Sequence, residues 1–374
     1  MELFFTDDNF KIGGHSFPKV PFFVDDQYRL IDEVNEFFTN DLLVDGRIGS
    51  PKTWKSYAYW LSDFLQWAEG NGVNWKTACK QEIIAYRNWS LEDCGLAPET
   101  VNSRITALKR FYTYAVRSGI VETNPISEVD SKAYAHADSD FLSHAHKITL
   151  KRNDLSVKVT HELPKVYSDS EVRRLFGATK SERLKLMMRL MLECGLRREE
   201  VVNLPTSAVE DAIQSAQQNG PGSEINFYLP ARICKGGKAR TVILSYPTAM
   251  KLMQYRATIR PKLVKKYKAK NKSAPEAFWL TQLGTAFKTE SLTTEIERLG
   301  EKANVKDAYP HRFRHTFATT LYAITGDLRL VQKLLGHSNI QTTTVYEHTA
   351  AVDQMGFFAD YQRHIDAMIS GGAD

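Results

Sequence analysis

Apolar side chains recur at the spacing of an amphipathic helix in three segments between residues 49 and 127. The first helix is expected over 51–70, because Ser50 can cap its N-terminus and the proline that follows suits a first helical turn. The pattern predicts a second helix at about 76–89 and a third at about 98–119. The sequence therefore predicts a compact helical domain over residues 49–127.

Helical periodicity returns over residues 164–348, where it is interrupted by one stretch with a strand pattern. Strands are expected at 225–229 and 232–234 and, after a Gly-rich turn at 235–238, at 241–244. We therefore predict a mainly α fold. It consists of a helical N-terminal domain followed by a mixed, mostly helical domain with a small antiparallel β-sheet.

Three segments lie outside these two predicted domains. Residues 1–48 form an acidic N-terminal extension with an amphipathic segment that is expected to pack on another element. Residues 128–163 are polar and irregular, which predicts an interdomain linker with two possible short strands, 147–151 and 155–160. Residues 349–374 form a C-terminal tail, whose apolar side chains can pack on their own domain or on a neighbouring subunit.

Length and composition fit two globular domains. A chain of 374 residues exceeds what one hydrophobic core usually holds. Hydrophobic and charged contents of 43% and 25% are ordinary for a globular protein, and no apolar run approaches the roughly 18 residues of a membrane-spanning helix. The cysteines lack CxxC spacing and the N-terminus lacks a basic leader, so we expect reduced thiols and a cytoplasmic location.

Charge is distributed unevenly along the chain. Residues 1–48 contain ten acidic and four basic side chains, a net charge of −6, which leaves +11 for the remainder of a chain whose total is +5. The basic remainder suits a polyanion such as nucleic acid, and the first segment does not. On the third predicted helix, Arg104, Lys109 and Arg110 lie opposite the apolar side. This face is either a DNA-binding surface or simply a solvated one.

Candidate catalytic side chains gather in residues 309–346. His311 and Arg314 share one face of a predicted helix, since positions i and i+3 are neighbours. A short helix follows and ends just before His337, and the next helix carries Tyr346. His311 and Arg314, the imidazole of His337 and the phenol of Tyr346 thus lie within one compact helical segment.

Two further candidates come from earlier in the chain. Arg197 follows a helix-breaking glycine and opens the next predicted helix, where backbone amides also favour anions. Lys235 lies in the hairpin turn, which can reach into a groove. Lys238, in the same turn, is the alternative for this lysine and a candidate DNA-binding residue. We expect the fold to bring these side chains together with those of residues 309–346.

No metal site is predicted. His311 and His315 are spaced i, i+4, as in a zinc-binding helix, but Arg312 stands where the HExxH pattern requires glutamate. The histidines of the linker have no cysteine or acidic cluster at ligand spacing near them.

The residue types favour phosphodiester transfer. Arginine forks match phosphate oxygens and keep their charge, so Arg197 and Arg314 suit the stabilisation of a pentacovalent phosphorus. A tyrosine hydroxyl can attack phosphorus and store the bond energy in a phosphotyrosine, which requires no cofactor. Lys235 could protonate a leaving oxygen, and His311 could exchange a proton with the tyrosine.

Four motifs in this order resemble those of the tyrosine recombinases, also called the phage integrase family. They are GLRREE at 195–200, CKGGKART at 234–241, HRFRHTFAT at 311–319 and LLGHSNIQTTTVY at 334–346. The resemblance identifies residues 164–348 as a catalytic domain and, more weakly, 49–127 as the helical core-binding domain of that family.

The resemblance assigns roles to the candidates. It implies that Tyr346 is the nucleophile, which forms a 3′-phosphotyrosine and releases a 5′-hydroxyl, while Arg197 and Arg314 hold the scissile phosphate. His337 would donate a further hydrogen bond to the phosphate.

The remaining roles concern protons and support. Lys235, or else Lys238, would protonate the leaving oxygen, and His311 would be the acid/base partner of the tyrosine. Glu200 occupies the place of an acidic residue that supports the first arginine.

The same resemblance implies a partner and an assembly. Family members close two domains around double-stranded DNA and form tetramers on two sites, without a cofactor. A type IB topoisomerase-like enzyme and a DNA-binding protein without catalytic activity remain alternatives. A recombinase of a mobile element in the cytoplasm, associated with the nucleoid when bound to DNA, is the leading hypothesis.

Overall fold

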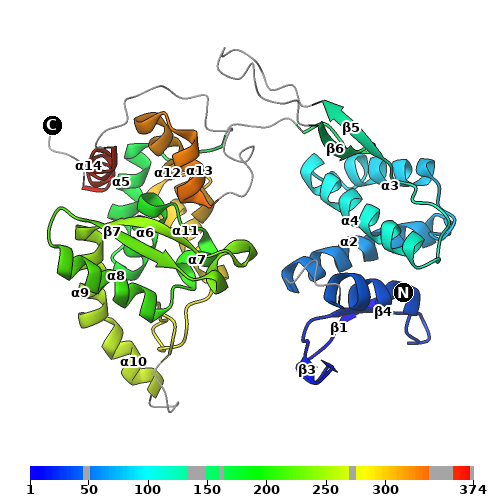
Figure 1. Cartoon of the computed structure of the whole chain (residues 1–374), viewed down its shortest axis with the longest axis horizontal. Helices are drawn as coiled ribbons and strands as arrows, with labels where there is room; N and C mark the ends of the chain where they lie inside the picture. The colour runs from blue at the N-terminus through cyan, green and yellow to red at the C-terminus, as the bar shows by residue number, and fades with distance from the viewer. Residues whose placement is uncertain (45–50, 133–148, 160–163, 269–274, 337–356, 371–374) are drawn as a thin grey trace. The chain divides into compact units, whose positions relative to one another are not determined.

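The computed structural model describes residues 1–44, 51–132, 149–159, 164–268, 275–336 and 357–370 (Figure 1). The chain divides into two compact units, Met1–His161 and Glu162–Asp374, each considered by itself. Helices dominate both, and the strands pair only in small two-stranded antiparallel sheets. The mainly α fold predicted from the sequence is confirmed.

Three helices form the body of the first unit. They are α2 (Pro51–Gly70), α3 (Lys80–Glu92) and α4 (Pro98–Arg117). The second begins later than the periodicity predicted, because the backbone N–H of Cys79 is capped by the Glu82 carboxylate at 2.7 Å. Aromatic rings fill the space between the helices, with Phe64 and Tyr86 packed edge to face at 5.2 Å between ring centroids.

Residues 1–44 are folded onto this helical body. The segment contains two small antiparallel sheets, β1 (Glu2–Phe5) with β4 (Pro21–Val24) and β2 (Lys11–Ile12) with β3 (His15–Ser16), followed by α1 (Asp32–Glu36) and the π-helix η1 (Phe37–Val44). Phe37 is 1% exposed and its ring packs edge to face on Phe111 of α4 at 5.4 Å. The amphipathic segment of the acidic extension therefore shares a core with the bundle.

A buried carboxylate links residues 1–44 to the helical body. Asp41 is 4% exposed and accepts hydrogen bonds from Arg110 Nε and Arg117 Nη2, both at 2.9 Å. Both arginines lie on α4, so an acid of the N-terminal segment neutralises part of the basic face of that helix.

The strands expected between 128 and 163 pair differently from the prediction. β6 (Thr149–Asn153) overlaps the predicted strand 147–151, but it pairs with β5 (Glu128–Lys132) and not with 155–160. Side chains of the helical body hydrogen-bond to part of the backbone of the latter segment instead. Asn102 of α4 exchanges two hydrogen bonds with the main chain of Val157, at 2.7 and 2.9 Å, and Leu155 is buried in the core of the first unit.

The second unit is built around α6 (Glu182–Cys194), which is buried along nearly its whole length and contacts α12, α9 and β8. The other α-helices among its described residues are α5 (Asp169–Ala178), α7 (Arg198–Val202), α8 (Thr206–Asn219), α9 (Tyr246–Thr258), α10 (Arg260–Lys268), α11 (Thr289–Ala303), α12 (Pro310–Thr325), α13 (Leu328–Leu335) and α14 (Phe357–Ser370). No helix of the described chain is both long and apolar enough to cross a membrane.

One hairpin crosses this unit. β7 (Glu224–Leu229) pairs with β8 (Arg240–Ser245), with Leu229 opposite Arg240. The predicted strand 232–234 is wrong: a 3-10 turn occupies Ala231–Ile233. Pro230 precedes it and has no N–H to continue the ladder, which explains where the strand ends.

The C-terminal helix packs on its own chain. α14 lies beside α5 (Figure 1), and Tyr361, Ile365 and Met368 are buried in the core of the second unit. Asp366 pairs with Arg189 of α6 at 2.5 Å, so a polar contact accompanies the apolar one. Of the two alternatives for the tail, this chain shows intramolecular packing of residues 357–370.

The burial of Phe37 predicts that residues 1–44 stabilise the first unit. Phe37→Ala removes a buried ring and should lower the local free energy of unfolding of α4 by about 3–5 kcal/mol. Hydrogen exchange of the α4 amides, measured by mass spectrometry on the whole chain, reports this change. Phe4→Ala is the matched control, since this ring is 39% exposed. Equal, small effects of the two substitutions would show that the N-terminal segment is not part of the core.

Candidate active site

The first part of the site forms where α6 ends. Gly195 takes a left-handed conformation with φ +60°, which stops the helix. Its carbonyl accepts a hydrogen bond from Arg314 Nη1 of α12. An ideal Cβ at Gly195 would lie 2.4 Å from Phe317 Cδ1, so only glycine allows α6 and α12 to approach this closely.

Arg197 and Glu200 form the second part, at the start of α7. Glu200 is fully buried, and its Oε2 accepts the backbone N–H of Arg197 at 2.7 Å while its Oε1 accepts Arg197 Nη1 at 2.8 Å. The carboxylate therefore caps the helix and orients the arginine. The structure thus places Glu200 in contact with Arg197, the arginine it was predicted to support.

The two predicted phosphate-binding arginines meet at the C-terminus of α13. Arg314 Nη2 donates to the carbonyl of Leu335 at 2.8 Å, and Arg197 Nη2 donates to the carbonyl of Gly336 at 3.3 Å. These carbonyls belong to consecutive residues, and the next residue of the chain is His337. Segments far apart in the sequence are therefore brought to one place in the fold.

His311 belongs to the same group. It lies three residues before Arg314 on α12, which begins with Pro310 in its first turn. His311 keeps access to solvent at the surface, but partial dehydration of its imidazole lowers the pKa of His311, and the charges of Arg314 and Arg197 act in the same direction. A lowered pKa favours the neutral imidazole, which is the form that can accept a proton.

A second histidine packs on the first. The rings of His311 and His315 meet edge to face at 5.1 Å between centroids. Burial lowers the pKa of His315 to about 4, with smaller contributions from His311 and Arg314. Among the described residues, no group of three or more histidine, cysteine or acidic side chains is placed to hold a metal ion.

The predicted lysines lie on the loop between β7 and β8. Lys235 opens a short turn, Lys235–Gly237, in which Gly236 has φ +76°, and both Lys235 and Lys238 are exposed. Within the described part of the chain, neither lysine forms an ion pair. Arg240 begins β8 directly after this loop. Its side chain lies beside those of Arg197 and Arg314, because it contacts Glu200 and the carbonyl of Leu335.

Arg240 is the residue that the sequence analysis missed. It lies in CKGGKART, two residues after the predicted hairpin turn and its two lysines. Only its contacts with Glu200 and Leu335, which are distant in the sequence, distinguish Arg240 from these lysines.

His337 and Tyr346 lie outside the described residues.

The predicted DNA-binding residues of α4 have intramolecular partners. Arg104 pairs with Asp63 at 2.6 Å, Lys109 pairs with Glu128, and Arg110 pairs with Asp41. Their charges are thus partly neutralised within the first unit.

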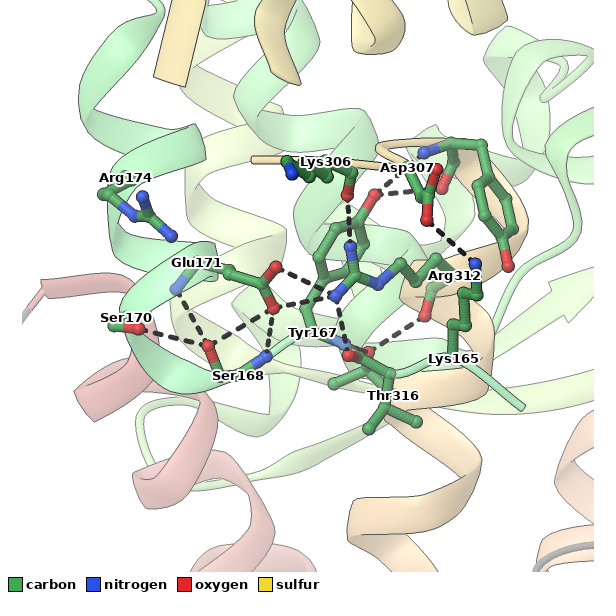
Figure 2. Close-up of polar contacts among 12 residues, drawn as sticks. Lys165, Tyr167, Ser168, Ser170, Glu171, Arg174, Lys306, Asp307, Arg312 and Thr316 are labelled. Atoms are coloured by element: carbon green, nitrogen blue, oxygen red, sulfur yellow. Dashed lines mark hydrogen bonds and ion pairs between the residues drawn. The ribbon is translucent and has the colours of Figure 1, made fainter. Parts of the chain in front are cut away.

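Arg312, between the two candidate residues of α12, faces the start of the second unit (Figure 2). Its Nη2 donates to both oxygens of Glu171, at 2.9 and 2.8 Å, and its Nη1 donates to the carbonyl of Lys306 at 2.8 Å. The guanidinium also stacks over the Tyr167 ring, 4.1 Å from its centroid. These contacts fix the first turn of α12 and thereby the positions of His311 and Arg314.

Comparison with known proteins defines the class. The model of the phage integrase family matches residues 165–352, and that of the phage integrase N-terminal SAM-like domain matches residues 36–119. The chain belongs to the phage integrase family, that is, to the tyrosine recombinases.

Particular relatives agree with this assignment. The chain is 25% identical over 319 residues to the tyrosine recombinase XerD of Oceanobacillus iheyensis, with 83% of this chain and 92% of that protein covered. It is 28% identical over 258 residues to XerD of Lacticaseibacillus casei, with 67% and 73% covered.

Solved structures show the same fold. The XerH site-specific recombinase bound to its palindromic difH substrate, in a post-cleavage complex, aligns with a TM-score of 0.56 at 19% identity, covering 92% of this chain and 89% of that one. A lambda integrase dimer bound to a COC′ core site aligns with a TM-score of 0.53 at 14% identity, covering 84% and 95%.

The contact at Gly195 generates a stability prediction. Gly195→Ala forces a Cβ into the Phe317 ring and a side chain into a left-handed conformation, so the second unit should lose about 2–4 kcal/mol. Hydrogen exchange of the α6 and α12 amides measures the loss. The control, Gly177→Ala in α5, places a Cβ where no atom lies within 4 Å and should be neutral or stabilising.

The half-buried imidazole of His315 predicts a pH dependence of stability. A histidine pKa lowered on folding means that the unfolded chain binds the proton more tightly, so stability is complete above the ordinary pKa of 6.5 and falls as the pH drops towards 4. His315→Gln should therefore lose less stability than the wild type between about pH 7.5 and about pH 5. Urea unfolding monitored by hydrogen exchange of α12 tests this, with exposed His15→Gln as the control.

Proposed function

We propose that this chain is a site-specific DNA recombinase that cuts and rejoins duplex DNA through a 3′-phosphotyrosine at Tyr346, in the integration, excision or transposition of a DNA element. The observation that carries the proposal is the meeting of Arg197 and Arg314 on consecutive carbonyls at the end of α13, directly before His337. Membership of the tyrosine recombinases supports it.

Two permanent cations beside each other suit a substrate with two or more anionic oxygens. A phosphodiester offers two such oxygens, and its charge grows as the tyrosine oxygen approaches phosphorus. Arginine remains protonated at any pH of interest, so the pair can stabilise this state without a proton transfer. His337 is assigned a further hydrogen bond to the same oxygens.

The proton transfers follow from the remaining residues. Tyr346 Oη forms a bond to phosphorus while the bond from phosphorus to the 5′ oxygen breaks. Neutral His311 takes the tyrosine proton, and Lys235 gives a proton to the leaving 5′ oxygen, with Lys238 as the alternative donor. Attack by the 5′-hydroxyl of a second duplex reverses these steps and joins the strands. No cofactor enters this scheme.

The partner is double-stranded DNA, on which we propose that four copies assemble at two sites. XerH and lambda integrase were solved as complexes with DNA, and the lambda integrase structure is a dimer. We place the activity in the cytoplasm, on the nucleoid. On this proposal residues 49–127 and 164–348 bind the duplex, and residues 349–374, whose helix α14 packs on its own unit in the single chain, exchange between subunits in the assembly.

Lys238 is the predicted DNA contact that needs the least rearrangement, because it is exposed. Arg104, Lys109 and Arg110 would exchange acidic side chains of their own unit for phosphates. The exchange is easiest where the acid is at the surface, as for Glu128, and hardest for buried Asp41.

Covalent trapping tests the proposal. The binding site is first located by footprinting on the DNA that flanks the coding sequence of this chain. A duplex of that site is then nicked just downstream of the cleavage position, so that the short fragment with the released 5′-hydroxyl diffuses away. The wild type should accumulate a covalent adduct with the 3′ end, while Tyr346→Phe should lower its rate by more than about 10,000-fold, as loss of a nucleophile does.

Tyr228→Phe provides the matched control, because this tyrosine is 56% exposed on β7 and should be dispensable. Absence of an adduct with the wild type on its footprinted site would refute the proposal. Adduct formation together with plasmid relaxation, but without exchange between two sites, would instead identify a topoisomerase.

A further inference from the structure

We propose that Arg240 is a positioning residue for strand exchange, which fixes Arg197, Arg314 and the end of α13 relative to one another. This inference rests on the proposed function. Arg240 lies at the start of β8, and its side chain is 9% exposed. It belongs to none of the roles assigned above.

The first contact of Arg240 is with the carboxylate that holds Arg197. Arg240 Nη2 donates to Glu200 Oε2 at 2.8 Å, while Arg197 Nη1 occupies Oε1 at the same distance. Glu200 is fully buried. A buried carboxylate is stable only when its charge is paired, so the position of Glu200, and of Arg197 with it, depends on both guanidiniums.

The second contact is with the carbonyl that holds Arg314. Arg240 Nη1 donates to the carbonyl of Leu335 at 2.6 Å, and Arg314 Nη2 donates to the same oxygen at 2.8 Å. Arg240 therefore shares one acceptor with each member of the arginine pair. The last carbonyls of a helix carry partial negative charge, which offsets the repulsion among the cations.

The third contact is steric and concerns the exit from α13. Gly336 has φ +63°, and an ideal Cβ there would lie 2.8 Å from both Cδ and Nη1 of Arg240. The Arg240 side chain thus lies directly against the residue that precedes His337. Its placement determines where the chain leaves α13.

The backbone of Arg240 is held independently of these contacts. It pairs with Leu229 in the β7–β8 ladder, so the guanidinium extends from a fixed strand. An arginine in this geometry bridges two acceptors with its planar fork, which a lysine ammonium cannot do. This predicts that charge alone does not replace Arg240.

Single-turnover adduct formation on the nicked duplex of the footprinted site tests the inference, at saturating protein. Arg240→Ala should lower the rate constant by about 100-fold, which is the effect expected of a small displacement of Arg197 and Arg314. Arg240→Lys keeps a positive charge near Glu200 and should keep the wild-type hydrogen exchange of α7 and α13. Its rate constant should still fall by at least about 10-fold.

Two comparisons separate positioning from other effects. Arg256→Ala is the matched control, because this arginine of α9 forms an exposed ion pair with Glu210 and should react at the wild-type rate. The second is a duplex with sulfur in place of the bridging 5′ oxygen. There the Tyr346 oxygen bonds to phosphorus, the phosphorus–sulfur bond breaks and sulfur leaves as a thiolate, which needs no proton donor.

The rate constant of Lys235→Ala should recover on the sulfur duplex. That of Arg240→Lys should not recover, because the defect of this variant lies in the positions of Arg197 and Arg314. Three results would each overturn the inference: wild-type rates in the Arg240→Lys variant, recovery of that variant on the sulfur duplex, or a loss of rate that disappears when the rate is expressed per folded molecule. If the wild type itself forms no adduct, both the proposed function and the inference about Arg240 fail. A reactive wild type with a fully active Arg240→Lys variant removes the inference alone.

Discussion

The candidate active site depends on one buried carboxylate. Glu200 has no access to solvent, and its charge is balanced by Arg197 on one oxygen and Arg240 on the other. Removing one partner from such a buried group typically costs about 3–5 kcal/mol, since a charge is left unpaired. The carboxylate lies on α7, which begins where α6 ends at Gly195. The geometry of the site is therefore tied to the most deeply buried helix of the second unit.

The positive charge gathered around Glu200 also sets the state of the neighbouring imidazoles. Loss of solvent around the imidazole lowers the pKa of His311, and the charges of Arg314 and Arg197 add to this effect by opposing another proton. The same field attracts a phosphate. One arrangement of charges thus favours both a neutral proton acceptor and an anionic substrate. Arg312 contributes indirectly to the positions of His311 and Arg314, because its contacts with Glu171 and Lys306 hold α12 in place.

Local patterns were sufficient for much of this fold, and for the chemistry of the candidate residues. Helical period and capping signals predicted α2 and α4, and alternation predicted β7 and most of β8. Distant contacts were beyond such patterns. The pairing of β5 with β6 needs partners separated by a long stretch of chain, and the burial of Arg240 depends on Glu200 and Leu335. Nothing in the spacing of CKGGKART distinguishes an arginine that will be buried from a lysine that will remain in water.

Asp41 has a consequence for how DNA binding should respond to salt. A cation that is bare in solution attracts counterions and DNA phosphates alike, and each phosphate it neutralises releases an ion, which gives a slope of about −0.9 in log affinity against log salt. Arg110 and Arg117 already hold a carboxylate. A phosphate that displaced it would exchange one anion for another, with no net gain in neutralised charge. If α4 binds DNA as proposed, the salt dependence that it contributes is therefore shallower than its basic residues suggest, and the N-terminal segment acts as a built-in counterion.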